Sequence, residues 1–111
     1  MLDVNIEFVK GVLFVRLQGK LNMDNTKDLE TKLVDIIVTG GIKYLVFNIK
    51  NSKLEERIDL FDKCNSLIKD NGGKMYICGL KNKIESIVGS DYEYCTKVND
   101  ELTVLKQVSI C

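Results

Sequence analysis

A strand that leads into a helical segment, between residues 43 and 73, constrains the fold of this chain most. Residues 44–49 read Tyr-Leu-Val-Phe-Asn-Ile, a nearly continuous apolar run that is typical of a strand covered on both faces. Residues 52–71 then place apolar side chains at helical spacing, which predicts a helix. A buried strand followed by a helix indicates a crossover unit of a parallel sheet. We therefore expect an α/β fold whose site lies where this strand meets this helix.

The remaining elements surround this unit. Alternating apolar residues predict an antiparallel hairpin that precedes a first helix closed by two glycines. With right-handed crossovers, the order ββαβαβαβα gives a small mixed, mostly parallel sheet of four or five strands with about four helices, in a single domain spanning 1–111. The other strands are expected at 4–8, 12–17, 75–78 and 94–98, and the other helices at 26–39, 82–88 and from 99–100 onwards.

Composition excludes several classes of function. Sixteen basic and sixteen acidic residues cancel, so no direct nucleic-acid partner is expected. The apolar runs are far shorter than the ~20 residues of a membrane span, and no signal peptide is visible, so we expect a cytoplasmic protein without membrane insertion. The chain has no histidine, G-x-S-x-G or phosphate-binding loop, which argues against an enzyme and against a required cofactor.

The four cysteines, at 64, 78, 95 and 111, form no C-x-x-C pair. Because the chain has no histidine, no histidine can join these cysteines as a zinc ligand. We interpret them as reduced thiols, buried or partly buried, and expect no metal site.

The start of the second helix carries a polar motif. Residues 52–55, Ser-Lys-Leu-Glu, read as an S-x-x-E capping box, in which Ser52 accepts from the amide of Glu55 and the glutamate reaches back. Tyr92 and Tyr94 are candidate interface anchors, although packing in a strand and loop explains them more simply.

The whole chain resembles the STAS domain, the fold of bacterial anti-sigma factor antagonists. The order and spacing of four segments carry the resemblance. They are the strand and Gly-x-Leu-Asn of 11–22, the Val-Phe-Asn-Ile of 46–49, the Gly-Gly segment of 72–80 and the start of the last helix at 98–102. The resemblance implies an interaction module controlled by phosphorylation. In the family pattern, a serine in an Asp-Ser-Ser-Gly-like turn is phosphorylated by a partner that is both anti-sigma factor and kinase. The phosphate adds about two negative charges at the binding surface.

This sequence departs from the family pattern at that turn. The acidic residue expected after Gly-x-Leu is Asn22, which is either a partner contact or a turn residue. Ser52 is the remaining hydroxyl, either a displaced phosphoacceptor or a helix cap. Glu55 and Glu56 either imitate a phosphorylated serine in part or suit a helix N-terminus. The positions aligned with Asp-Ser-Ser-Gly are Leu54, Glu55, Glu56 and Arg57.

The resemblance therefore implies a domain that regulates transcription by binding an anti-sigma factor/kinase-like protein, without the usual serine switch. The expected binding region is formed by Asn22, Ser52 and residues 54–57. Two alternatives stay open: an accessory STAS subunit of a transporter or larger signalling complex, and a nucleotide- or lipid-binding STAS domain that uses a helix N-terminus for anions.

Overall fold

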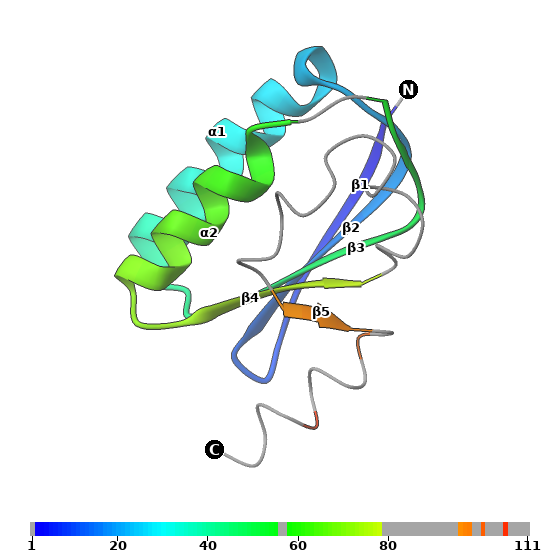
Figure 1. Ribbon diagram of the computed structural model, residues 1–111. Helices are drawn as coiled ribbons and strands as arrows, with labels where there is room; N and C mark the ends of the chain where they lie inside the picture. Colours follow the sequence, from blue (N-terminus) through cyan, green and yellow to red (C-terminus); the bar gives the residue numbers. More distant parts are fainter. Residues whose placement is uncertain (1, 56–57, 79–95, 99–100, 102–105, 107–111) are drawn as a thin grey trace.

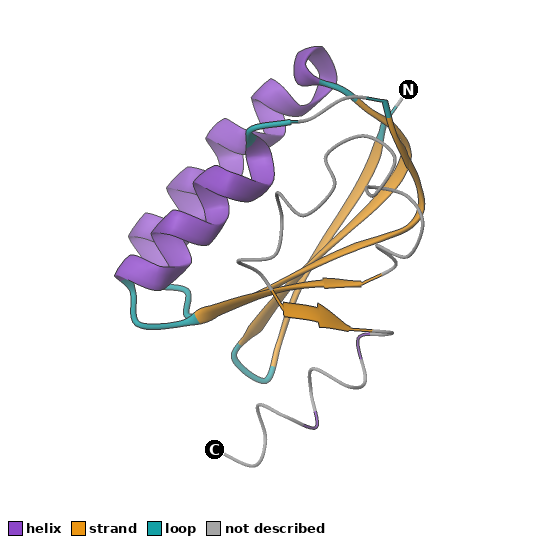
Figure 2. Ribbon diagram, viewed as in Figure 1, coloured by secondary structure: helices purple, strands orange, loops and turns teal. Residues whose placement is uncertain are grey.

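The computed structural model describes residues 2–55, 58–78, 96–98, 101 and 106. Its sheet has five strands in the order β1-β2-β3-β4-β5, with β1 antiparallel to β2 and all other neighbours parallel. Helices α1 and α2 lie side by side on one face of that sheet (Figures 1 and 2). The predicted mixed, mostly parallel α/β sheet is confirmed. The elements are β1 Asp3–Val9, β2 Val12–Leu21, α1 Met23–Gly40, β3 Tyr44–Leu54, α2 Leu60–Asp70, β4 Lys74–Cys78 and β5 Thr96–Val98.

The expectation of about four helices is not supported, because the described residues contain two. The helix expected at 82–88 lies outside the described residues, as do Tyr92 and Tyr94. Of the expected last helix, the structure describes Glu101 and Lys106, both with helical backbone. Strand β5 falls within the strand expected at 94–98.

Helix α1 begins earlier than predicted because Asn22 caps it. The Asn22 side chain accepts from the backbone N–H of Asn25, and the Asn25 side chain accepts from the backbone N–H of Asn22. This is a capping box built from two asparagines, a variant of the more familiar Ser/Thr and Glu/Gln pair. The predicted end is confirmed, since Gly41 closes the helix in the left-handed conformation with φ 60°.

The predicted start of the second helix is wrong. Strand β3 continues through Ser52 to Leu54, and α2 begins at Leu60 without a side-chain cap from Asp59. The reason lies in β2, which shifts register between Arg16 and Gln18 and then runs on beside the end of β3. This continuation supplies the second half of β3 with strand partners, whereas a capping box offers only local hydrogen bonds.

Strand β3 is buried on both faces, which explains its apolar run. On the helix side, Phe47 is fully buried and meets the ring of Phe61 edge-on, with 4.9 Å between centroids. On the opposite face, Val46 belongs to a second apolar cluster with Val12, Phe14, Tyr76 and Cys78. The predicted core positions Val46, Phe47 and Ile49 are confirmed.

Two sequence features have a packing reason. Gly73 lies so close to the preceding loop that an added Cβ would fall 1.7 Å from the carbonyl oxygen of Lys43, so only glycine fits. Cys64 and Cys78 are buried, as predicted, whereas Cys95 and Cys111 lie outside the described residues. Burial, with a smaller effect of the Glu30 charge, raises the pKa of the Cys64 thiol to about 12.

Candidate functional site

The predicted site lies where β2 and β3 end side by side. Leu21 and Leu54 form the last pair of these strands, and the backbone N–H of Glu55 then donates to the carbonyl of Leu21 at 2.9 Å. Helix α1 begins directly after β2 at the same edge of the sheet (Figure 1). We call this end of strands β2 and β3 the junction and define it as residues 20–25 with residues 53–55.

Two of the predicted site residues meet at the junction. The Asn22 Nδ2 donates to Glu55 Oε1 at 3.0 Å, while Asn22 Oδ1 accepts from the N–H of Asn25 at 2.9 Å. Asn25 Nδ2 in turn donates to the carbonyl of Lys20 at 2.7 Å. One side chain therefore caps α1 and also joins the helix to the end of β3. Asn22, for which the sequence suggested a partner contact or a turn, caps α1 in the structure, and its predicted contact with a partner stays a prediction.

The junction presents charges of both signs to solvent. Lys20, Asp24, Lys53 and Glu55 are exposed, and Asn22 is half-buried between them. At the start of α1, the N–H of Asn25, one of the amides that an anion would meet, already donates to Asn22 Oδ1 at 2.9 Å. A mixed and accessible polar surface of this kind is typical of the rim of a protein contact.

Ser52 lies inside the sheet and away from the exposed surface of the junction. It pairs with Gly19 in β2, the residue is 7% exposed, and its hydroxyl donates to the carbonyl of Leu17 at 2.7 Å. The hydroxyl therefore satisfies a strand carbonyl where the register of β2 has just shifted. The structure does not describe Glu56 and Arg57, and it describes Leu54 only through its backbone pairing.

A second polar cluster, missed from the sequence, lies on the face of the sheet opposite the helices. Arg16 Nη2 donates to Glu101 Oε1 at 2.7 Å, and Arg16 Nε donates to Glu101 Oε2 at 2.9 Å. Asn48 Nδ2 donates to the same Oε2 at 2.8 Å. The cluster therefore ties β2 and β3 to the C-terminal part of the chain.

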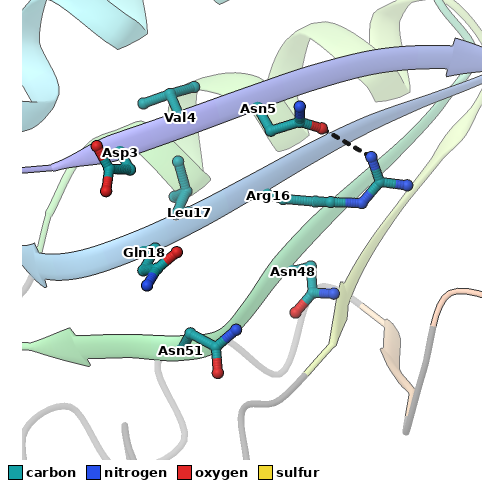
Figure 3. A pocket seen from close by; sticks show the side chains of 8 residues that line it. All are labelled: Asp3, Val4, Asn5, Arg16, Leu17, Gln18, Asn48 and Asn51. Carbon is teal, nitrogen blue, oxygen red and sulfur yellow. Dashed lines mark hydrogen bonds between the residues drawn. The ribbon is translucent and has the colours of Figure 1, made fainter.

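Arg16 also reaches β1. Its Nη1 donates to Asn5 Oδ1 at 2.8 Å, the bond drawn in Figure 3, and lies 3.0 Å from Glu7 Oε1. The hydrogen bond to Glu101 is the main reason that the pKa of Arg16 is raised. Burial would raise the pKa of Glu101, but hydrogen bonds from Arg16 and Asn48 and the nearby positive charges outweigh it and lower that pKa.

The sequence carried a signal for this cluster. Arg16 and Asn48 each interrupt an apolar strand, and they are direct partners in the β2–β3 register. Two polar interruptions that face each other inside a sheet indicate a shared partner, because neither group can be buried alone. The partner, Glu101, is far away in the sequence and has no local feature that marks it.

A shallow cavity of about 270 Å³ adjoins this cluster (Figure 3). Within the described part of the chain, no three histidine, cysteine or carboxylate side chains are grouped so that they could hold a metal ion. Over the same residues, neither helix is long and apolar enough to cross a membrane. The cavity is lined by Asp3, Val4, Asn5, Arg16, Leu17, Gln18, Asn48 and Asn51.

The sheet order, the two helices on one face and the polar junction define a small α/β domain with a polar surface of mixed charge where β2 and β3 end. The chain belongs to the STAS domain family, whose sequence model matches residues 3–90. The fold agrees with solved structures at low sequence identity. The anti-sigma factor antagonist SpoIIAA in its unphosphorylated form is 13% identical, with a TM-score of 0.76 over 96% of this chain and 98% of that one.

Two further structures show the same fold. The Bacillus cell fate determinant SpoIIAA in its phosphorylated form is 12% identical, with a TM-score of 0.74 over 96% of this chain and 99% of that one. A serine-to-glutamate variant of RsbS from Moorella thermoacetica is 18% identical, with a TM-score of 0.74 over 97% of this chain and 98% of that one. These likenesses establish the arrangement of strands and helices.

Proposed function

We propose that this domain is a cytoplasmic, non-enzymatic interaction module of the anti-sigma factor antagonist type. It regulates transcription by binding an anti-sigma factor/kinase-like protein, and it needs no cofactor. The observation that carries the proposal is the Asn22–Glu55 hydrogen bond of 3.0 Å, which holds the start of α1 against the end of β3. Together with the hydrogen bond of 2.9 Å from the Glu55 N–H to the Leu21 carbonyl, this bond links β2, β3 and α1 at the junction. The binding surface consists of the junction, which includes Leu54, and the connection that follows it, with Glu56 and Arg57.

In this proposal the usual serine switch is lost. Support comes from Ser52, whose hydroxyl is buried and bonded to Leu17, so a kinase would have to open the β2–β3 pairing to reach it. Glu55, in contrast to Ser52, is exposed at the junction. A glutamate carries one charge where a phosphoserine carries about two, so its imitation of the phosphorylated form is partial. Because the Ser52 hydroxyl is not accessible for phosphorylation, the domain in this proposal binds its partner constitutively.

The test uses purified kinase-type anti-sigma factors from the same cells. Each is measured against the wild type, against Glu55→Lys, and against Asp70→Lys as a matched exposed carboxylate at the far end of α2. We expect one of these factors to bind the wild type and the Asp70 variant equally, and the Glu55 variant at least tenfold more weakly. Equal binding of all three proteins would refute the junction as the surface.

The lost switch is tested on the same complex. After incubation with the bound kinase and ATP, intact-mass and peptide mass spectrometry should find Ser52 unmodified. Phosphate on Ser52 would overturn this part of the proposal while leaving the partner unchanged. Binding to a permease, with none to any anti-sigma factor, would instead favour the accessory-subunit alternative. A nucleotide-binding role is less favoured because the N–H of Asn25 at the start of α1 is already hydrogen-bonded to Asn22 and the sequence has no phosphate-binding loop.

A further inference from the structure

Among the described residues, strand β1 is an edge strand without the usual protection against pairing. All seven residues of Asp3–Val9 pair with β2 in an uninterrupted register, so no bulge twists the free edge away. The segment reads Asp-Val-Asn-Ile-Glu-Phe-Val and contains neither lysine nor proline. Natural sheets block exposed edges with such residues or with bulges, and an edge that lacks them is a template for another strand.

Apolar side chains are exposed along this edge. Val4 is 42% and Phe8 is 60% exposed, and they make up two of the three exposed large apolar side chains among the described residues. Val4, Ile6 and Phe8 lie opposite residues of the helix-side core, yet only Ile6 packs against that core. The one-sided burial expected for this strand therefore holds at Ile6 alone.

The polar side chains of β1 are directed toward its own sheet. Asn5 and Glu7 both contact Arg16 of β2, so the only charge in the middle of the strand, Glu7, lies 3.0 Å from a positive charge that Arg16 also shares with Glu101. Asp3 at the start of the strand is the remaining charge. An approaching strand therefore meets little repulsion along most of the edge.

The hairpin also fixes which backbone groups face outward. Lys10 and Gly11, with φ 52° and 83°, form a two-residue turn between the paired residues Val9 and Val12. In such a turn the flanking pair exchanges both hydrogen bonds, and bonded and non-bonded pairs then alternate along the ladder. Val4, Ile6 and Phe8 consequently direct their N–H and C=O groups to the free edge.

We propose that a second copy of this chain pairs antiparallel with β1 about a twofold axis at Ile6, so that one sheet runs through both copies. In this register Ile6 faces Ile6, and each Val4 faces Phe8 of the other copy. These three residues direct their backbone N–H and C=O groups to the free edge, so in this register those groups of the two copies can hydrogen-bond to each other. Cross-strand pairs of an aromatic and a β-branched residue are favourable.

Charges favour the same register. Glu7 of one copy lies opposite Asn5 of the other, so the glutamates do not face each other. Asp3 falls opposite Val9 and next to Lys10 of the second copy, which places opposite charges at both ends of the interface. No junction residue belongs to β1, and the pairing leaves both partner-binding surfaces of the proposed function in place.

The test combines two double variants with a matched control. Val4→Lys with Phe8→Lys places like charges opposite each other in the dimer, whereas Val4→Lys with Phe8→Glu places opposite charges there. Val38→Lys changes a third exposed apolar side chain, 60% exposed, on α1. Sedimentation equilibrium from low micromolar to about millimolar concentration measures the dimer constant, and circular dichroism confirms that each variant is folded.

We expect the wild type and Val38→Lys to dimerise with the same constant. The lysine–lysine variant should be at least tenfold weaker, and the lysine–glutamate variant should recover most of the loss. A wild type that stays monomeric across the range would overturn the proposal. So would a dimer that both double variants weaken equally, because the register would then be wrong.

Discussion

Glu101 provides the sharpest test of how the C-terminal part of the chain is held. We consider Glu101→Gln, Arg16→Met and the double variant as a thermodynamic cycle. Methionine keeps much of the arginine's apolar stem, and glutamine keeps the size of the glutamate while removing its charge. The two side chains share hydrogen bonds of 2.7, 2.9 and 3.2 Å.

The magnitude follows from burial. Exposed ion pairs are worth roughly 0.2–1 kcal/mol, and hydrogen bonds to charged groups roughly 1.5–3 kcal/mol. The Glu101 side chain is 19% exposed and that of Arg16 is 36% exposed, so solvent screens the arginine side of the pair. We expect a coupling free energy of about 1–2 kcal/mol at pH 7, measured by urea unfolding.

The pH dependence has a definite sign. The folded-state pKa of Glu101 is lowered, so its contribution to stability is complete above the unfolded-state pKa of about 4.3 and is lost as pH falls through the folded-state pKa. The difference between wild type and Glu101→Gln should therefore be constant from about pH 5.5 to 7 and shrink below about pH 4. Asp70→Asn, an exposed carboxylate, serves as control and should change stability by less than about 0.5 kcal/mol.

Two results would refute this reasoning. A coupling free energy below about 0.3 kcal/mol would mean that the two side chains do not act together in solution. A difference between wild type and Glu101→Gln that grows toward acid pH would mean that burial, rather than the hydrogen bonds, dominates the ionisation of Glu101.

Three further predictions concern the core. Phe47→Ala should lower the free energy of unfolding by about 3–5 kcal/mol, because the ring is fully buried against Phe61; a loss below about 1 kcal/mol in urea unfolding would contradict this packing. Ser52→Ala should cost about 1–2 kcal/mol, and Ser52→Asp clearly more, because a charge would be buried beside the Leu17 carbonyl; an aspartate variant as stable as wild type would instead support a helix cap. Iodoacetamide should modify Cys64 far more slowly in the folded protein than in urea, and reducing agent should leave the melting temperature unchanged; rapid labelling or a fall of several degrees would show an accessible thiol or a disulfide.

The sequence by itself determined the strand at 44–49, the hairpin, the glycine end of α1 and the membership in a family. The first three features rest on periodicity, apolar runs and glycines within short segments of chain, whereas the family resemblance rests on the order and spacing of four such segments. The family resemblance also grouped Asn22 with residues 54–57 in one expected binding region, and the structure brings Asn22 and Glu55 together.

Only the tertiary structure decided where β3 ends and what Ser52 does. The Ser-Lys-Leu-Glu motif offers local capping bonds, but β2 continues past its register shift and pairs with the same residues, so the motif becomes strand. In the same way, Arg16 and Asn48 can be seen as polar interruptions in the sequence, yet their partner Glu101 is brought to them only when the chain folds. A pattern within a few residues reports local preferences, whereas a strand partner or a buried ion pair depends on residues that are distant in sequence.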